Sequence, residues 1–368
     1  MSHIILDART ANEHFPGIGR YVTSLAQALH LTQPDLPVML LRNPAAITPP
    51  TLPDLPTIEC TASPFSLQQQ WRVRSILQQA RTALYHSAYY LMPYLPGAPV
   101  VLTCYDLIPL IFPHYFSAPQ RLIFRLSHWL ALHTACATLA ISEATKTDLI
   151  RFFHIDPARI VVTPLAADGH FQPPSRAEID RVRQAYALPD RYVLYFGSNK
   201  PHKNVPRLVQ AFAQIGIRDR GSEIGLVIAG HWDARYPEAK QAVEQLGLAD
   251  RVKFIGPVQD DELPALYGGA EVFVFPSQYE GFGLPVLEAM ACGTAVICGN
   301  RSSLPEVAGD AALLCDANDV TMLAQTIEQV IAERDLRETL RARSLARAAQ
   351  FTWERTAALT ADIYRQWL

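Results

Sequence analysis

Residues 272–297, VFVFPSQYEGFGLPVLEAMACGTAVI, place a polar, glycine-containing loop and a short helical segment between two apolar runs. The first run ends near Phe275, and Pro285 suits the first turn of a helix. Gly293 suits the end of that helix, directly before the second run. A strand, a helix and a second strand in this order are typical of a parallel sheet covered by helices. The stretch therefore predicts an α/β fold.

The same alternation continues through the rest of the chain. In the second half we expect strands at 192–197, 224–230, 252–256, 271–277 and 294–299, with helices at 205–215, 238–246, 261–267 and 285–291. In the first half we expect strands at 3–8, 37–42, 83–87, 100–106, 137–142 and 159–165, with helices at 19–31, 119–136 and 143–154. The Pro-rich stretch 43–56 is expected to be an irregular loop.

A length of 368 residues predicts two domains. We place their boundary at 168–178, where Pro173 and Pro174 stop any regular element. The expected division is residues 1–170, residues 171–350 and a C-terminal helix, 351–368, which could pack back on the first domain. Ligands of doubly wound sheets bind outside the carboxyl ends of the strands, so the loops there are the candidate sites.

Composition excludes several classes of protein. Neither half is basic, with 11 Lys and Arg against 10 Asp and Glu in residues 1–170 and 21 against 25 in residues 171–368, so no nucleic-acid partner is expected. The six cysteines form no CxxC pair and the histidines lack metal-ligand spacing, which predicts reduced thiols and no metal site. No signal peptide or membrane span is apparent, and a cytoplasmic protein is expected.

One segment leaves membrane contact open. Residues 121–140, RLIFRLSHWLALHTACATLA, are strongly apolar but interrupted by Arg121, Arg125 and His133. This composition favours a buried helix, with His133 in the core, over a helix that lies on a membrane surface.

A polar loop and a helix start follow the expected strand that ends at Gly197. Lys200, His202 and Lys203 lie at or just before this helix start, where free N–H groups and the helix dipole attract anions. Lysines at this position oppose the dipole unless an anion is bound. The pattern favours a phosphate site over a solvated loop without a ligand.

Glu280 and Glu288 would lie on the same edge of the sheet, one before and one just inside a helix. Gly281 and Gly283 would let backbone N–H groups approach a ligand. Carboxylates accept hydrogen bonds from vicinal hydroxyls, as in ribose and hexose recognition. The alternative is that Glu288 only faces the helix dipole and Glu280 is a surface residue.

A third loop, residues 8–22, contains Gly17 and Gly19 followed by Arg20. This is a weak dinucleotide motif, because the third glycine position holds Val22 and no acidic residue ends the next strand. A phosphate or a sugar could approach this glycine turn, whereas NAD binding is not expected.

Taken together, these motifs resemble the retaining glycosyltransferases of family 4, in which two Rossmann-like domains face each other across a cleft (the GT-B architecture). Glu280 and Glu288 match the family's Glu-x7-Glu motif, and residues 197–204 match its donor-phosphate loop. Further stretches are similar to bacterial mannosyltransferases: ISEATKTDLI, RIVVTPLA, SSLPEVAGDAALL and YDLIPLIFP.

The resemblance implies roles for these residues. Lys203 would hold the diphosphate, and Glu288 the ribose hydroxyls of the nucleotide. Gly19, with Gly17, would approach the phosphates from the N-terminal, acceptor-side domain. The donor hexose would be held by Glu280 and by the backbone of Phe282, Gly283 and Leu284.

Two departures from the family pattern concern the site. Ser198 stands where many relatives have an arginine, so Arg20, Lys200 or His202 would have to supply that charge. Tyr105 stands where many have a histidine beside the donor sugar; we count it among the catalytic candidates, with Glu280 and Lys203.

The resemblance implies a retaining transfer of a hexose, with mannose from GDP-mannose as the favoured donor, to a saccharide or lipid-linked acceptor. No metal or resident cofactor is implied. A silent sugar-nucleotide-binding subunit and a UDP-sugar-dependent transferase remain alternatives, as do peripheral membrane contact and any oligomeric state.

Overall fold

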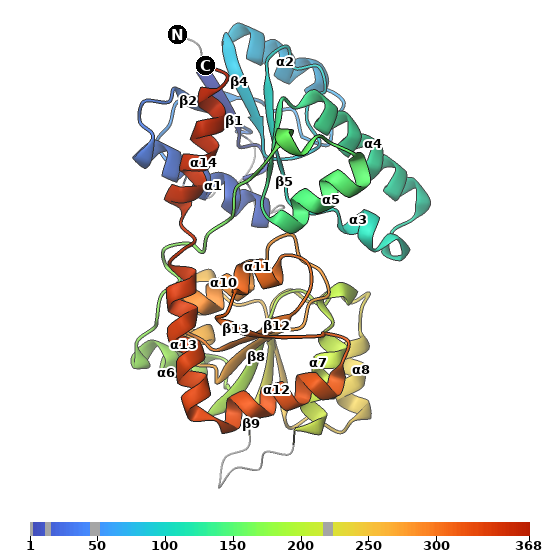
Figure 1. The fold of residues 1–368 in the computed structure, drawn as a ribbon, viewed down its shortest axis with the longest axis vertical. Coiled ribbons are helices and arrows are strands. Elements are labelled where there is room, and N and C mark those ends of the chain that lie inside the picture. Colours follow the sequence, from blue (N-terminus) through green and yellow to red (C-terminus); the bar gives the residue numbers. More distant parts are fainter. Residues whose placement is uncertain (1–2, 12–15, 45–51, 216–223) are drawn as a thin grey trace. The chain divides into compact units, whose positions relative to one another are not determined.

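The computed structural model of the protein describes residues 3–11, 16–44, 52–215 and 224–368. The chain forms two compact units (Figure 1). Unit 1 comprises Met1–Leu165 with Thr352–Leu368, and unit 2 comprises Ala166–Phe351. The C-terminal helix is thus part of unit 1. The sequence placed the break a few residues later, at the Pro173-Pro174 pair.

Unit 1 is built on a seven-stranded sheet whose neighbouring strands pair in parallel, in the order β3-β2-β1-β4-β5-β6-β7. The strands are β1 (His3–Asp7), β2 (Val38–Arg42), β3 (Thr57–Glu59), β4 (Thr82–Ser87), β5 (Val100–Cys104), β6 (Ala137–Ala140) and β7 (Ile160–Val162). The strand order reverses between β1 and β4, so the sheet is doubly wound and has a switch point there.

Helices cover both faces of this sheet (Figure 1). They are α1 (Pro16–Thr32), α2 (Gln69–Gln79), α3 (Ile108–Ile111), α4 (Ala118–Thr134), α5 (Glu143–Phe153) and α14 (Trp353–Arg365), with short 3-10 turns η1 (Pro113–Tyr115) and η2 (Pro157–Arg159). Part of the expected loop at 43–56, residues 45–51, lies outside the described residues.

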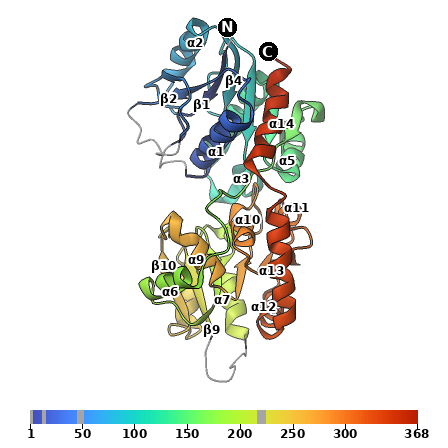
Figure 2. The ribbon, with the colours of Figure 1, turned by 90° about the vertical axis from the view of Figure 1, so that its left-hand side faces the viewer.

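Helix α14 packs alongside α1 (Figure 2). A buried polar chain holds it there: the Tyr364 hydroxyl lies 2.5 Å from His86 Nδ1, and His86 Nε2 lies 2.7 Å from Thr103 Oγ1. Thr103 Oγ1 is also 2.9 Å from the Tyr21 hydroxyl of α1. Burial lowers the pKa of His86 to about 3, so the imidazole is neutral in this network.

The expectation of a buried helix at residues 121–140 is wrong for one face of α4. Ser117 caps the helix through a reciprocal capping box with Gln120, as its sequence favours. Only His128, Ala131 and Leu132 are buried, whereas Leu122, Ile123, Leu126 and Trp129 on the other side are exposed. His133, expected in the core, is also exposed.

Unit 2 is built on a six-stranded parallel sheet in the order β10-β9-β8-β11-β12-β13. The strands are β8 (Arg191–Phe196), β9 (Ile224–Ala229), β10 (Val252–Gly256), β11 (Val272–Phe275), β12 (Val296–Gly299) and β13 (Ala312–Cys315). Here the order reverses between β8 and β11. All residues of β9, β11 and β12 are buried, because helices cover both faces of the sheet.

The helices of unit 2 are α6 (Arg176–Ala185), α7 (Val205–Gln214), α8 (Glu238–Gln245), α9 (Leu263–Gly268), α10 (Leu284–Ala291), α11 (Leu304–Ala308), α12 (Val320–Ala332) and α13 (Arg334–Ala348), with 3-10 turns η3 (Pro201–Lys203) and η4 (Asp260–Glu262). The α/β prediction is confirmed for both units. Among the described helices, none is long and apolar enough to cross a membrane.

Candidate functional site

The candidate site lies at the switch point of the unit 2 sheet. Strands β8 and β11 are adjacent, with Val272 opposite Val193 and Phe273 opposite Leu194. Their parallel direction brings the loop after β8, residues 197–204, beside the loop after β11, residues 276–283. This edge of a doubly wound sheet is where such folds bind ligands.

The loop after β8 is fixed by close backbone packing and by Asn199. Gly230, after β9, has φ of +113°, and a Cβ there would lie 2.3 Å from the Gly197 carbonyl oxygen. The Asn199 amide donates to the carbonyls of Asp233 and Tyr236 at 2.8 and 2.7 Å, and it accepts from the Asp233 N–H. The loop therefore enters η3 in one defined conformation.

Lys203 and Glu280 form a bidentate ion pair at this edge. The Lys203 Nζ lies 2.6 and 2.7 Å from the two carboxylate oxygens of Glu280. The two side chains are only 16% and 10% exposed. Lys203 also lies 5.2 Å above the Phe275 ring. Among the residues that the structure describes, the Glu280 carboxylate is the hydrogen-bond acceptor of this ammonium, so the two predicted site residues act as one unit.

Two serines hold the main chain around Glu280. Ser302 Oγ and Ser303 Oγ donate to the Glu280 carbonyl at 2.6 and 3.0 Å, and Ser303 Oγ lies 2.8 Å from the Phe282 carbonyl. Gly283 has φ of +100°, and a Cβ there would lie 2.7 Å from a Leu304 methyl group. A side chain at Gly283 would therefore be strained and crowded, which explains glycine at this position.

Helix α10 begins at Leu284, directly after Gly283. The first N–H groups of a helix have no acceptor within that helix, and Pro285 at the second position has no N–H. The N–H of Leu284 therefore lies at the positive end of α10, a few residues after Glu280 in the chain.

Glu288 is a buried residue of α10. It is 3% exposed, and its Oε2 accepts a 3.0 Å hydrogen bond from the Tyr267 hydroxyl. The backbone of Tyr267 is in turn held by Thr294 Oγ1, which donates to the Tyr267 carbonyl. Burial, with Glu288 nearby, raises the pKa of the Cys292 thiol. Glu288 is thus a buried carboxylate held in one orientation from outside its own helix.

The three predicted residues around the phosphate loop differ in character. Lys200 is exposed. The Ser198 carbonyl accepts a 2.7 Å hydrogen bond from the Tyr195 hydroxyl. His202 is buried, and burial together with Lys203 and Lys200 lowers its pKa to about 3. A neutral imidazole does not supply the charge of the absent arginine, which leaves Lys200 and Arg20 as alternatives.

The remaining predicted site residues belong to unit 1. Tyr105 directly follows β5, and its ring packs edge-on against Tyr21 at 5.5 Å. Its hydroxyl is buried and has no hydrogen-bond partner among the described residues. Burial, with Tyr21 and Cys104 nearby, raises its pKa well above the usual value, so the phenol is neutral.

The expected glycine turn at Gly17 and Gly19 is wrong in its local structure. Helix α1 begins at Pro16, so both glycines and Arg20 lie in its first turns. Neither glycine is among the described residues with positive φ. Pro16 fits the first helical position and explains why the helix starts before the glycines. Residues 12–15 of this predicted loop lie outside the described part of the chain.

A pocket that the sequence did not reveal opens at the carboxyl ends of β8, β9 and β10. Its volume is about 280 Å3, and its lining includes Gly197, Gly230, Trp232, Lys240 and Phe254. Lys240 Nζ lies 4.6 Å from the centre of the Trp232 ring. An aromatic wall beside a cation and two glycines suits a flat, polar ligand group.

Sequence reasoning also missed Asn199, Tyr267, Ser302 and Ser303. Each acts by holding a predicted residue or its loop. Ser302 and Ser303 belong to a stretch that resembles the family, and that resemblance was the available signal for them. No group of metal-ligating side chains occurs in the described ranges.

Comparison with known proteins shows which family the chain is similar to. Residues 177–347 match the family model for glycosyl transferases group 1, and residues 16–169 match that for glycosyltransferase family 4. The O-antigen chain mannosyltransferase B of Escherichia coli is 36% identical over 300 residues, which cover 81% of this chain and 77% of that protein.

A second relative is longer than this chain. The serotype-specific mannosyltransferase WbdA of Escherichia coli is 32% identical over 267 residues, or 71% of this chain but only 33% of WbdA. Among solved structures, Anabaena Alr3699/HepE in complex with UDP and glucose matches with a TM-score of 0.78 over 100% of both chains at 20% identity. That likeness confirms the GT-B type of α/β fold. The chain therefore belongs to the group 1 glycosyltransferases of family 4.

Proposed function

We propose that this glycosyltransferase moves mannose from GDP-mannose to a saccharide or lipid-linked acceptor, with retention of configuration. The observation that carries the proposal is the partly buried Lys203–Glu280 pair beside the start of α10, with the buried Glu288 inside that helix. A cation, two carboxylates and a helix N-terminus at one sheet edge suit a sugar nucleotide, which offers both phosphates and hydroxyls.

The chemistry assigns a separate task to each group. The bond between the anomeric carbon and the diphosphate oxygen breaks, and its electron pair stays on that oxygen. The acceptor hydroxyl oxygen bonds to the anomeric carbon from the same face, and its proton passes to the leaving phosphate. Lys203 would stabilise the negative charge that develops on the diphosphate, which is the largest contribution expected from such a site.

The two carboxylates would bind hydroxyl groups. Glu280 would accept hydrogen bonds from the hexose while Lys203 holds its carboxylate in place, with the backbone at Phe282, Gly283 and Leu284 beside it. Glu288 would accept hydrogen bonds from the ribose, with Tyr267 fixing its orientation. The pocket beside Trp232 and Lys240 would hold a further flat part of the donor. No step requires a metal ion.

The choice of mannose rests on the relatives. Both Escherichia coli proteins are named mannosyltransferases. The structural neighbour, in contrast, was solved with UDP and glucose. A UDP-sugar donor is therefore the alternative that an experiment must distinguish from GDP-mannose.

Donor turnover tests the proposal. The purified chain is incubated with GDP-mannose, GDP-glucose, UDP-glucose or UDP-galactose, with and without a simple mannoside, and the released nucleoside diphosphate is measured. We expect release from GDP-mannose above the other donors, and an α-linked product by NMR, which matches the α-linked donor. Preference for a UDP-sugar, a β-linked product, or nucleotide binding without release from any donor would contradict the proposal.

We further propose a cytoplasmic location. All six cysteines are free thiols, and five of them are buried. Thiols without disulfide bonds fit a reducing compartment.

A further inference from the structure

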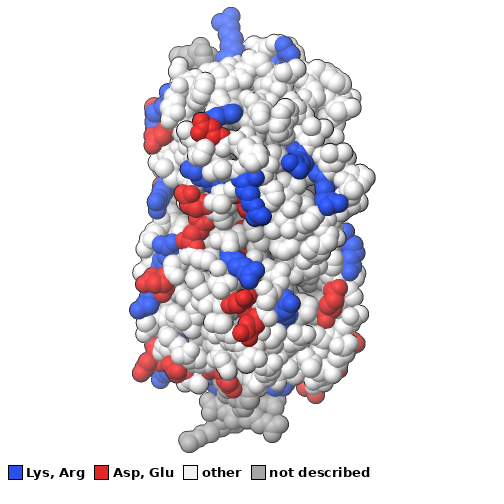
Figure 3. All heavy atoms as spheres, turned by 45° about the vertical axis from the view of Figure 1, so that its right-hand side comes forward, with Lys and Arg blue, Asp and Glu red and all other residues white. Residues whose placement is uncertain are grey.

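Lys203 is a single cation, and its effect on a diphosphate depends on where its ammonium is held. Over much of the face drawn in Figure 3, Lys and Arg side chains lie next to Asp and Glu, so opposite charges partly offset one another at a distance. Charge stabilisation of a leaving group is therefore local, and it requires donors that are placed in advance at the developing charge. The contacts of the two residues beside Lys203 in the chain accordingly matter for the reaction.

The carbonyl group directly before Lys203 is held by the loop after β11. The His202 carbonyl oxygen accepts a 2.8 Å hydrogen bond from the Gln278 N–H, and Ser277 Oγ lies 3.2 Å from the same oxygen. The Ser277 side chain is fully buried. The loop that carries Glu280 thus holds the backbone before Lys203.

The residue directly after Lys203 is held by the loop after β13. Asn204 has φ of +64°, in the left-handed region that asparagine enters more readily than most residues. Its side-chain amide donates to the Ala317 carbonyl, and its Oδ1 accepts a 3.0 Å hydrogen bond from Arg207. Asn204 is buried, so water does not compete freely for these bonds. Lys203 therefore stands between two anchored residues.

Asn318, in the loop after β13, joins the two anchors. Its Oδ1 accepts 2.8 Å hydrogen bonds from Arg207 Nη1 and from Gln278 Nε2. Arg207 leads to the residue after Lys203, and Gln278 leads to the carbonyl before it. One oxygen atom thus ties both neighbours of Lys203 to the loop after β13.

The loop after β13 has a fixed conformation of its own. Asp316 Oδ1 accepts a 2.9 Å hydrogen bond from the Asn318 N–H, and the Asp316 carbonyl accepts one of 3.0 Å from the Asp319 N–H. Asp319 in turn caps α12 by accepting from the Met322 N–H at 2.9 Å. The side chain of Asn318 is exposed, but its backbone is held in place.

Packing alone does not fix the loop after β8, because this loop borders a pocket. The pocket has a volume of about 440 Å3, and Asn199, Pro201, Asn204 and Arg207 contribute to its lining. A loop beside a pocket lacks close packing on that side, so hydrogen bonds have to hold it. Asn199 holds the start of the loop, and the bonds at Asn318 hold its end.

We propose that Asn318 is a positioning residue for the transfer reaction, which acts through Arg207 and Gln278 on the placement of Lys203. Its amide oxygen holds the end of the loop after β8, so that the Lys203 ammonium meets the diphosphate where negative charge develops. Asn318 acts through the loop and does not itself bind the donor. The inference rests on the proposed function, because it takes the diphosphate as the ligand of Lys203.

Loss of this oxygen should slow the chemical step more than it weakens donor binding. The two carboxylates of the site would still bind the sugar hydroxyls, whereas a small displacement of a preorganised cation raises the barrier. Leucine is similar in size to asparagine and has no acceptor atom. We expect Asn318→Leu to lower kcat about tenfold and to leave the donor KM within about twofold of the wild type.

The measurement is release of the nucleoside diphosphate by the whole chain, with GDP-mannose or, if another donor turns over faster, with that donor. Thermal unfolding checks that each variant is folded. A surface bond with a merely structural role would lower the unfolding midpoint and leave kcat of the folded protein unchanged.

Two variants serve as controls. Asn318→Asp keeps an acceptor oxygen beside Arg207, so its turnover should stay within about threefold of the wild type. Asn300→Leu is the matched substitution in the loop after β12. Asn300 is also exposed, and it bonds the Cys315 carbonyl through its backbone N–H, which leucine retains. It should turn over as the wild type does, and a loss equal to that of Asn318→Leu would overturn the inference.

A double variant tests whether Asn318 acts through Lys203. If it does, adding Asn318→Leu to Lys203→Met should lower turnover by no more than about twofold beyond the loss in Lys203→Met alone. Effects that multiply would show that the two residues act independently, and they would overturn the inference.

The same variants distinguish this inference from the proposed function. Wild-type kcat in Asn318→Leu, with slow turnover in Lys203→Met, overturns the inference alone. Equal losses in Asn318→Leu and Asn318→Asp also overturn it, because the acceptor oxygen would then have no effect. Wild-type turnover in Lys203→Met would instead remove the diphosphate role of Lys203 from the proposed function, and the inference would fall with it.

Discussion

The two sheets each carry an ion pair at the switch point of their strand order, buried in unit 1 and partly buried in unit 2, and the two pairs differ in how many hydrogen bonds they make to other groups. In unit 1, Arg9 follows β1 and binds the Asp7 carboxylate at 2.6–3.2 Å. In unit 2, Lys203 follows β8 and binds Glu280 after β11. The position in the fold is the same, but the surroundings are not.

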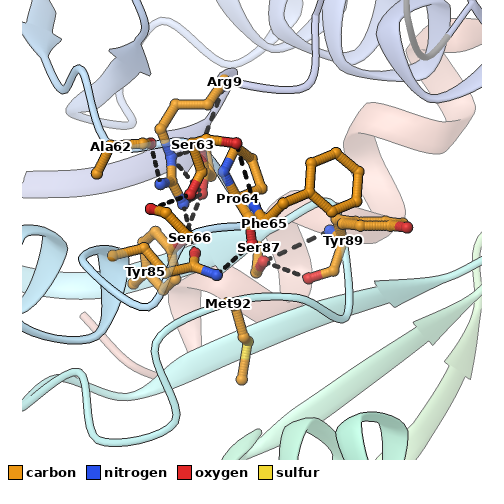
Figure 4. Close-up of polar contacts among 12 residues, drawn as sticks. Arg9, Ala62, Ser63, Pro64, Phe65, Ser66, Tyr85, Ser87, Tyr89 and Met92 are labelled. Carbon is orange, nitrogen blue, oxygen red and sulfur yellow. Dashed lines mark hydrogen bonds and ion pairs between the residues drawn. The ribbon is translucent and has the colours of Figure 1, made fainter. Parts of the chain in front are cut away.

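The unit 1 pair is closed off by protein groups. Arg9 also donates to the Ala62 carbonyl and to Gln69, and the Tyr85 hydroxyl donates to Asp7 at 2.5 Å (Figure 4). Burial alone would raise the pKa of Asp7, but the charge of Arg9 and hydrogen bonds from Arg9 and Tyr85 lower it. This network fastens the segment after β3 to the sheet.

The unit 2 pair has fewer protein partners. The ammonium of Lys203 has three protons, and among the described residues it donates them to Glu280 only. Capacity for further hydrogen bonds at the carboxyl edge of a doubly wound sheet favours ligand binding, whereas a saturated pair favours stability. The comparison therefore assigns a structural role to one pair and a functional role to the other.

The largest effect is expected for Arg9→Met. This variant leaves Asp7 buried beside apolar carbon, and loss of one partner of a buried pair typically costs about 3–5 kcal/mol in stability. Urea unfolding measures it, and Asp7→Asn in the same background should recover part of the loss. An unchanged unfolding midpoint would show that the network in unit 1 is not structural.

Lys203→Met should lower the transfer rate by about a hundredfold, on the order of 3 kcal/mol, because one preorganised charge at the leaving group is lost. Because Lys203 and Glu280 are mostly buried, this variant should also lose stability, unlike a substitution in a solvated loop.

The double variant Lys203→Met/Glu280→Gln separates the two effects of Lys203. It should recover stability but not turnover, since it removes the uncompensated charge without restoring the cation. Lys253→Met is the control, because Lys253 in the same unit bonds a backbone carbonyl. If Lys203→Met turns over at the wild-type rate at saturating donor, Lys203 does not bind the diphosphate.

Glu288→Gln tests the second buried carboxylate of unit 2. A hydrogen bond to a charged group is worth about 1.5–3 kcal/mol, so the affinity for GDP should fall by roughly one to two orders of magnitude. Calorimetry with GDP measures this. If the affinity is unchanged and only the unfolding midpoint falls, the bond between Tyr267 and Glu288 serves packing alone.

The pH dependence of stability should be steeper in unit 1. Burial lowers the folded-state pKa of His86 and His128 in unit 1 and of His202 in unit 2 to about 3. The unfolded chain takes up these protons near pH 6.5. The part of the folding stability that depends on the neutral histidines is therefore fully present above that pH. It falls as the pH drops toward 3, by about 1.4 kcal/mol per pH unit for each histidine.

Hydrogen exchange measured by mass spectrometry at pH 7 and pH 5, corrected for intrinsic exchange rates, reports each unit separately. Unit 1, with two such histidines, should lose more protection than unit 2. Substitution of His128 by Phe should reduce the difference. Equal loss of protection in both units would contradict the attribution of the pH dependence to the buried histidines of unit 1.

The smallest effect is expected for Tyr105→Phe. One neutral hydrogen bond to a ligand is worth about 0.5–1.5 kcal/mol, so turnover should fall by about tenfold at most. Because the buried hydroxyl has no described protein partner, its removal should leave stability unchanged or raise it. Tyr105→His should retain activity. Unchanged turnover and donor KM in the Phe variant would make Tyr105 a packing residue.

Local sequence patterns were sufficient to predict most of the helices and strands. Apolar runs such as residues 192–197 and 224–230 coincide with buried strands, and the expected C-terminal helix is present as α14. The missed strands, β3 and β13, are short, and in β3 two of the three residues are exposed. A strand of three residues at the edge of a sheet does not leave a periodic signal of its own.

The sequence by itself determined the fold class, the family and the identity of the polar residues at the carboxyl edge of unit 2, because each depends on short patterns within a few turns of chain. Tertiary structure decided which of these residues meet. Lys203 and Glu280 are 77 positions apart, and they pair because β11 lies next to β8 in the sheet. It also decided which face of α4 stays exposed, since burial depends on what the rest of the fold packs against a helix, and not on the helix composition.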